Sequence, residues 1–534
     1  MQIRILALKF NLKLSSCENC HCKIRAIAKI SGSVRGDFAM PEEQSNLVSE
    51  TTRYLAATAY LSRKFRTQVL DKIEYRVAKG LAPEVGVDMP TVIHHCRRAR
   101  RWTRIRDVIM VLVWVYILWQ TILIAVVNEI IVFPDALPFA FEWLVNANSG
   151  ELAIAAGVAV AVTLIQRFLN QNALLHEMAP GMTKWDSAWV NGDPSIPMEY
   201  RNPEKHNLIA YASFNPFVGS GIPLGGWSTA LRHDKTPDNP LQDKGTAENF
   251  DIEELYARVE RDVKDLGIEN LTVRHLVFCR GDDMRAFGYV PAKALVPAYK
   301  LDDDDVKAIR VKPSTNRRHY IAFTIADWRG ELVFTQFFRA ERLRTDLFLE
   351  ATQSLLTPFV DKFKKVDKLE SGWRLGTLLR LLSTSILLAP LYFLMAPVRL
   401  YLMLVKPIQA MFANFWARRR VRRNPSHNFG VAQSLREAAA SPNYQVYFQR
   451  LDFERNAKII ERQLLDTLIV FLKEHNIDTA ALSERGTTIQ NNGVMISGNA
   501  SLSTDNLAVG QNAKNRVAGL FGGRKNDAGG KKAA

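Results

Sequence analysis

Four glycines are the first residues whose spacing suggests chemistry. Gly219, Gly221, Gly225 and Gly226 lie within residues 214–227, between two apolar runs. The backbone amides of a glycine-rich loop can hold a phosphate or another anion. However, the segment contains no Gly-Lys-Ser/Thr, and its glycines miss the dinucleotide-binding spacing by one residue. We therefore favour a structural turn between strands, and we keep ligand binding by these four glycines as the alternative.

A second group with chemical potential is the sequence Arg280-Gly-Asp282-Asp283. Its two carboxylates, like those of the acidic run 302–305, could bind a cation or act as an acid and a base. Acidic residues are also common in the turns that follow strands, and no partnered side chains complete a site here. We interpret both groups as turns, with Arg280, Asp282 and Asp283 as alternative ligand-binding residues.

Histidine and cysteine usage points away from catalysis and metal binding. None of the ten histidines pairs with Ser or Cys in a nucleophile motif, so we assign no catalytic residue and interpret His275 and His319 as structural. Residues 17–22 hold three cysteines and a histidine with ligand-like spacing, but the His-His-Cys sequence at 94–96 is more than seventy residues away. We expect free thiols, no metal ion and no cofactor.

The C-terminal segment 489–513 has the composition of a self-associating β motif. Its short apolar runs end in glycine and asparagine, and two of its pieces nearly repeat. Such strands of low charge favour cross-β stacking between identical chains. The simpler alternative is a short hairpin or β-arch packed on its own chain. The residues expected to mediate self-association are Ile489, Val494, Ile496, Asn499, Leu507, Val509 and Asn512.

The elements around these groups include a membrane anchor. Residues 108–128 carry no charge and reach about 30 Å as a helix, the thickness of a bilayer core. Six arginines within 97–106 precede this stretch, and such an excess stays on the cytoplasmic side. No Lys or Arg lies between Arg106 and Arg167, and 152–166 is a second apolar stretch rich in small residues. These features predict a transmembrane hairpin.

A third apolar region, 375–416, is interrupted by three basic residues and three prolines. The prolines break any single straight helix, and positive charge stands at both ends of the region. A single crossing would place one of these charge clusters outside the cell, against the usual bias. We therefore favour a broken transmembrane or re-entrant element that turns near 390–397, with both ends in the cytoplasm.

The formal net charge of +16 does not indicate nucleic-acid binding. Eleven arginines fall in two short clusters, 97–106 and 418–423, each beside an apolar segment. This placement favours the lipid bilayer and its anionic headgroups as partners, and we expect no nucleic-acid partner.

The soluble part reads as α+β, because strands and helices mix without βαβ alternation. The predicted elements are a strand at 207–213 paired with one at 227–231, a helix at 251–266, a strand at 271–279, a hairpin of 319–326 with 331–339, a helix at 347–366 and a helix at 444–475. The fold class is thus a membrane α-helical protein with an α+β domain, an antiparallel sheet, a C-terminal helix and a short β motif.

These elements divide the chain into eight parts. They are an N-terminal extension (1–45), a cytoplasmic helical domain (46–106), the transmembrane hairpin (107–169), the cytoplasmic α+β domain (170–370), the broken segment (375–416), a C-terminal helical region (430–485), the β motif (486–515) and a disordered tail (516–534). Met40 opens a separate acidic segment, so a start at Met40 is the alternative to a disordered extension that includes residues 1–39.

Several of these segments resemble a set of bacterial membrane proteins, best represented in actinobacteria, that have no assigned function. The matching pieces are Glu50-Thr-Thr-Arg-Tyr-Leu, His95-Cys-Arg-Arg-Ala-Arg-Arg, Phe214-Asn-Pro-Phe-Val-Gly-Ser-Gly with Gly226-Trp-Ser, Arg280-Gly-Asp-Asp, Trp328-Arg-Gly-Glu-Leu-Val and Asn492-Gly-Val-Met-Ile-Ser-Gly. The resemblance covers about residues 46–515. The C-terminal pattern is also similar to amyloid-signalling or RHIM-like motifs of bacterial proteins. Neither likeness implies catalytic residues.

The expected protein is a multi-pass protein of the bacterial inner membrane with cytoplasmic soluble domains. We expect a non-enzymatic scaffold or signalling protein that self-associates through its C-terminus. The alternative is a membrane-anchored enzyme or ligand sensor that uses the loop 214–227 and the turn 280–283. A transporter fits poorly, because the chain shows no inverted repeat.

Overall fold

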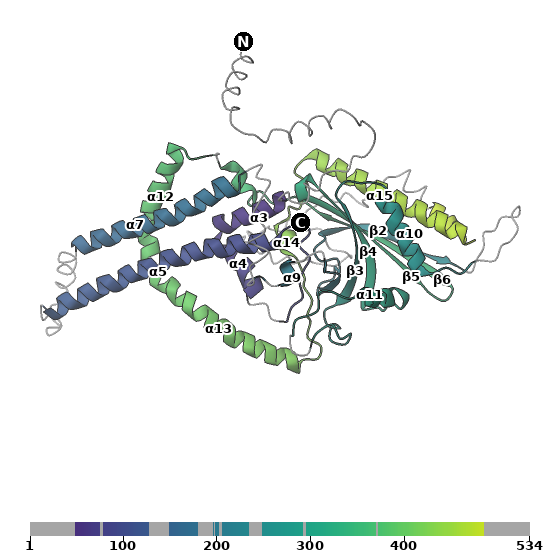
Figure 1. Cartoon of the computed structure of the whole chain (residues 1–534), viewed down its shortest axis with the longest axis horizontal. Coiled ribbons are helices and arrows are strands. Elements are labelled where there is room, and N and C mark those ends of the chain that lie inside the picture. The colour runs from purple at the N-terminus through teal and green to yellow at the C-terminus, as the bar shows by residue number, and fades with distance from the viewer. Residues whose placement is uncertain are drawn as a thin grey trace, which may run out of the picture. The chain divides into compact units, whose positions relative to one another are not determined.

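Six strands, most of whose side chains are buried along β4 and β5, build one sheet, shown in Figure 1. The computed structural model describes residues 49–74, 78–127, 149–179, 196, 198–201, 205–233, 248–291, 295–369 and 372–484. The strands are β1 (Leu208–Tyr211), β2 (Ile222–Arg232), β3 (Leu271–Arg280), β4 (Arg317–Asp327), β5 (Leu332–Arg342) and β6 (Asp346–Leu356). Their order is β1-β3-β4-β5-β6-β2.

The sheet is mixed, which corrects the prediction of an antiparallel sheet. β1 pairs in parallel with β3, whereas every other neighbouring pair is antiparallel. The predicted pairing of 207–213 with 227–231 is wrong, because β1 and β2 stand at opposite edges. Residues 212–221 carry the chain from one edge to the other, and a crossing of this kind leaves no local trace in the sequence.

Two helices cover one face of the sheet, α10 (Ile252–Lys264) and α15 (Tyr447–Glu474). Both helices were predicted, and Figure 1 shows them side by side over the strands. Their apolar stripes, which include Leu255 and Leu464, pack on inward-facing residues such as Phe323 and Leu349 to form the largest core. Burial of these apolar surfaces is the main stabilising term of the domain.

The region 347–366 is not the helix that we predicted. Side chains alternate along β6, with Leu347, Leu349 and Ala351 fully buried and Phe348 and Glu350 less so. The strand also lies between β5 and β2, so both of its edges are paired. Long-range pairing on two sides outweighs the helical spacing that the leucines also satisfy.

A helical unit precedes the sheet. It contains α3 (Glu50–Leu61), α4 (Arg63–Glu74) and the start of α5 (Met89–Val127), and the Ser49 side chain caps α3. The remaining elements are α7 (Ser149–Asn172) with a π-turn at Ala173–Glu177, α9 (Met198–Arg201), α11 (Asp303–Val311), the 3-10 turns Trp328–Gly330 and Lys364–Lys368, α12 (Leu375–Leu394), α13 (Ala396–Arg423) and α14 (Leu435–Ala439).

Long apolar helices stand apart from the sheet. Two of them, Ala153–Glu177 and Leu375–Leu394, are long and apolar enough to span a membrane. Core helices of soluble proteins can pass the same test, so it establishes length and composition only. α5 and α7 pack against each other, and α12 runs across both (Figure 1). The helix is interrupted at Met395, and the chain continues as α13. The break lies within the predicted turn at 390–397.

Candidate functional site

The glycine loop does hold an anion, and the anion belongs to the protein itself. The backbone N–H groups of Gly219 and Gly221 donate to Oε1 of Glu437, at 2.7 and 3.0 Å. Both glycines have positive φ, +93° and +90°, and a Cβ on Gly221 would lie 2.2 Å from the carbonyl oxygen of Leu355. Two amides of the loop are thus paired within the chain, with Glu437 as their common acceptor.

A second carboxylate supports the helix that carries Glu437. Ser434 and Glu437 form a capping box at the start of α14, and Glu84 accepts the N–H groups of Leu435 and Arg436 at 2.7 and 2.8 Å. Burial raises the pKa of Glu84 to about 7, although the two amide bonds act against this shift. Burial also raises the pKa of Glu437. Two carboxylates thus share one short helix N-terminus.

Arg436 stands between these acidic groups and the sheet. Its side chain is fully buried, and Nη2 donates to the carbonyl oxygens of Glu331 and Thr357 at 2.6 and 2.9 Å. The guanidinium carbon lies 4.2 Å from the ring centre of Phe359. Burial lowers the pKa of Arg436 to about 10, so the group stays charged at neutral pH. This arginine fastens α14 to the ends of β5 and β6.

The turn Arg280–Asp283 has a packing role. Arg280 and Asp282 form an ion pair of 2.9 Å, whereas Oδ2 of Asp283 is buried with no hydrogen-bond partner among the described residues. The N–H of Gly281 donates to the carbonyl oxygen of Tyr211, and a Cβ on Gly281 would lie 2.2 Å from the amide nitrogen of Gly430. Gly281 has no room for a side chain, because the segment that contains Gly430 crosses the turn here.

The structure does not bring the two predicted ligand groups together. Gly225 and Gly226 lie in β2 at one edge of the sheet, and Arg280 ends β3 near the other edge. Three strands separate β3 from β2, which at the usual strand spacing amounts to about 19 Å. One small ligand cannot contact both groups.

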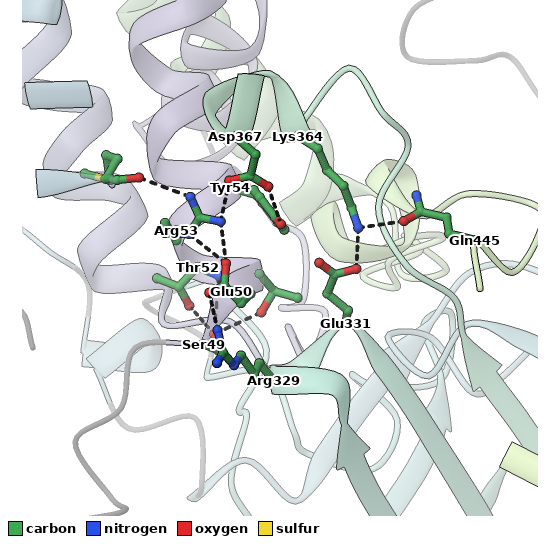
Figure 2. Close-up of polar contacts among 12 residues, drawn as sticks. Ser49, Glu50, Thr52, Arg53, Tyr54, Arg329, Glu331, Lys364, Asp367 and Gln445 are labelled. Carbon is green, nitrogen blue, oxygen red and sulfur yellow. Dashed lines mark hydrogen bonds and ion pairs between the residues drawn. The ribbon is translucent and has the colours of Figure 1, made fainter. Parts of the chain in front are cut away.

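A polar junction joins the helical unit to the sheet (Figure 2). Nη2 of Arg53 donates to Asp367 at 2.6 Å, Nε donates to Glu50 at 2.7 Å, and the hydroxyl of Tyr54 donates to Asp367 at 2.7 Å. Glu50 also pairs with Arg329 in the turn between β4 and β5. Each charged group in this junction is matched by an opposite one. We therefore interpret the junction as a structural joint.

Glu260, His275 and His319 form a hydrogen-bonded chain of titratable residues that was not predicted. Nδ1 of His275 lies 3.1 Å from Nε2 of His319, and Nε2 of His275 lies 3.0 Å from Oε2 of Glu260. The hydrogen bond from His275 lowers the pKa of Glu260 to about 2. Burial lowers the pKa of His319 well below its usual value, so this imidazole stays neutral. The structural interpretation of both histidines fits these contacts.

An open groove of about 590 Å³ lies on the second face of the sheet. Its floor is a row of side chains in register across neighbouring strands: Arg339 pairs with Glu350, which in turn pairs with Ser228. Nη1 of Arg339 lies 3.5 Å from Glu350, and the hydroxyl of Tyr320 donates to the same carboxylate at 3.2 Å. The other lining residues are Gly226, Trp227, Pro313, Ser314, Thr315, Arg318, Glu341, Phe348 and Thr352. The groove is suited to a polar ligand that carries both charge signs.

Gly226 is the one predicted ligand residue that lines this groove. The sequence did not single out Arg339 or Glu350, because their pairing depends on strand register. Among the described residues, no group of three His, Cys, Asp or Glu side chains is placed to hold a metal ion. The residues predicted for self-association lie outside the described residues, as does the 17–22 cluster.

The described chain thus combines a mixed sheet with long apolar helices. Residues 226–503 match the AbeC-like domain, which is just over half of the 534 residues, and the chain belongs to this family. None of the curated proteins or solved structures compared with the chain matches it. The family match is consistent with the resemblance to bacterial proteins of unassigned function. The likeness to amyloid-signalling motifs stays a prediction.

Proposed function

We propose that this protein is an inner-membrane protein of a bacterium whose apolar helices anchor a cytoplasmic α+β domain. The observation that supports this most directly is the exposure of large apolar side chains on α5, α7, α12 and α13, with Leu112, Trp119 and Leu387 at 62, 64 and 76%. Other members of this surface are Val115, Ile154, Ile165, Leu375, Leu394, Leu404, Phe412 and Trp416. An apolar surface of this extent requires a cover, and lipid suits it.

The charge pattern supports an orientation for the anchor. Arginines precede the apolar part of α5 and end α13, whereas the chain between α5 and α7 contains no Lys or Arg. We therefore place that connection outside the cytoplasm and the sheet within it. On this basis the protein is multi-pass, with the bilayer and its anionic headgroups as partners.

Membrane extraction and reporter fusions test this topology. The full-length protein should stay in the membrane pellet through high salt and alkaline carbonate. Fusions after Ala140 should report an external position, and fusions after Lys300 a cytoplasmic one. Release by carbonate, or the same compartment for both fusions, would contradict the proposal.

Within this topology we favour a non-enzymatic scaffold or signalling role with self-association through the C-terminus. The support is indirect. We call Gly219, Gly221 and the Glu437 carboxylate that they bind the Glu437 cradle. The junction of Figure 2 and the Glu437 cradle are both filled by the chain's own groups, and no catalytic set of residues stands out among those described. Deleting residues 486–534 should reduce the oligomer size in detergent, measured by light scattering. An oligomer of unchanged size would remove this role.

Ligand sensing is the second candidate, and the groove above Arg339 favours it. A bound polar ligand should raise the thermal midpoint of the full-length protein, and Arg318→Gln should weaken that rise, since Arg318 lines the groove. Arg423→Gln at the end of α13 is the matched control. Nucleotides and divalent cations are the probes, and an absence of any shift with both would leave the groove without a ligand role.

A further inference from the structure

A compact set of charged and aromatic side chains lies where the four apolar helices meet. α5 contributes Arg106 and Asp107, which are 4 and 7% exposed, and α13 contributes Arg399, whose Nη1 lies 3.5 Å from Oδ1 of Asp107. Nη1 of Arg106 donates to Gln166 of α7 at 3.3 Å. Tyr392 of α12 lies beneath both guanidinium groups, at 4.2 and 4.8 Å. We call this set the Arg106–Arg399 cluster.

Positive charge exceeds negative charge in the cluster. Asp107 is engaged mainly by Arg106, through Nε at 3.0 Å and Nη2 at 2.6 Å. Nη1 of Arg399 is buried with no hydrogen-bond partner among the described residues. The charged groups that act on Arg399 are Arg63 and Arg106, which repel it, and Asp107, which attracts it. Two guanidinium groups therefore share one carboxylate in the cluster.

The position of the cluster fits a membrane boundary. Asp107 is followed directly by the uncharged stretch that begins at Val108. One to two turns further along α5, Trp114 stacks on Phe393 and donates its Nε1–H to the carbonyl oxygen of Phe393 at 2.9 Å. After the break at Met395, the first turn of α13 carries Arg399, which contacts Asp107. Tryptophan and arginine are typical of the level of the lipid headgroups.

We propose that the Arg106–Arg399 cluster binds the phosphate headgroup of an anionic phospholipid. An unbalanced charge at the edge of a low-dielectric region is costly, and a bound phosphate removes the excess. Guanidinium groups match phosphate geometry with paired N–H donors, and basic pockets between helices on the cytoplasmic side suit such headgroups. The acyl chains would lie along exposed residues such as Val398 and Leu402. This inference rests on the proposed membrane anchoring.

The contacts assign different roles to the two arginines. Arg106 is held by Asp107 and Gln166 and serves to position the cluster. Nη1 of Arg399 lies 3.5 Å from Asp107 without making a hydrogen bond, and the Arg399 side chain is 13% exposed, so Arg399 is the group that meets the phosphate. Substitution of Arg399 should therefore affect lipid binding without removing the contacts that join α5 to α7.

Native mass spectrometry of the full-length protein in a non-ionic detergent tests the site. Added phosphatidylglycerol should give a saturable adduct that binds about tenfold more tightly than phosphatidylcholine. A tenfold difference in affinity corresponds to about one hydrogen bond between charged groups. Arg399→Gln should remove most of this difference, and Arg399→Lys should keep part of it. Arg380→Gln is the matched control, because Arg380 is exposed on α12 outside the cluster. It should change the affinity by less than about twofold.

Several outcomes would overturn the assignment. Equal binding of the two lipids by the wild-type protein would remove the site, as would an equal loss for Arg399→Gln and Arg380→Gln. Displacement of the lipid by millimolar inorganic phosphate would indicate a free-anion site instead. Carbonate extraction of the same proteins separates the two proposals: a protein that is released contradicts membrane anchoring, whereas one that is retained without lipid preference contradicts only the headgroup site.

Discussion

The Glu437 cradle makes a quantitative prediction about one carboxylate. Glu437→Gln keeps an oxygen for the amides of Gly219 and Gly221, but its NH2 group then faces the N–H of Ser434, which Oε2 accepts at 2.8 Å in the wild type. Losing one charge-assisted hydrogen bond and leaving one buried donor unpaired costs about 3 kcal/mol. Relief of the buried charge, which raises the pKa of Glu437, offsets part of this cost. We expect a net loss of about 2 kcal/mol.

Hydrogen exchange of the full-length protein measures this loss locally. Exchange at pH 8 in peptides that cover 217–224 and 434–440 should become about 30-fold faster, while peptides from β4 and β5 stay protected. Glu454→Gln is the control, because Glu454 pairs only with the exposed Arg450 on the outer side of α15. Unchanged exchange in both cradle peptides would refute the reasoning, since the amides would then be held by other contacts.

Three further predictions concern packing and pH. Gly221→Ala should destabilise the protein by about 3 kcal/mol in thermal unfolding, because the added Cβ would meet Leu355 and the residue has positive φ. Gly157→Ala in α7 is the control: its Cβ would have no neighbour within 4 Å, and it should change stability by less than about 1 kcal/mol. Phe217→Ala should cost about 3–5 kcal/mol by the same measurement, because the ring packs on Phe278, Tyr320 and Phe337, and an equal cost for the exposed Phe214→Ala would contradict this. Because the pKa of Glu84 is raised in the folded protein, this residue contributes stability below pH 4.5 that is lost as pH rises through about 7. Between pH 5 and 8 the free energy of unfolding of the wild type should therefore fall by about 2 kcal/mol relative to Glu84→Gln. Parallel pH profiles of the two proteins would contradict the assignment.

Local signals in the sequence predicted the elements that depend on local contacts. The turn Trp328–Gly330 joins the two strands of the predicted hairpin, and α10 and α15 form where helices were predicted. Each of these features is decided within one or two turns of the chain. The short helix α14 could also have been found, because Ser434 and Glu437 have the spacing of a capping box.

Features that depend on distant partners could not be predicted in the same way. β6 has leucines at spacings that suit a helix, and only its pairing with β5 and β2 makes it a strand. The partner of the glycine loop could not be found from the sequence, because Glu437 lies 218 residues away from Gly219. The contacts of His275 likewise depend on distant parts of the chain: the register of β3 with β4 brings it to His319, and the packing of α10 on the sheet brings it to Glu260. Burial and pairing, rather than residue type, decide these sites.

The crossing at Gly281 is one of the places where the segment that follows α13 contacts the sheet. After α13 ends at Arg423, Phe429 donates to the carbonyl oxygen of Gly281, and Gly80 donates to that of Phe429 at 2.6 Å. The chain then reaches Glu437 within eight residues. The crossing and the hydrogen bonds of Glu437 lie on one short segment, so hydrogen exchange at 217–224 should respond to substitutions at Gly281 as it does to those at Glu437.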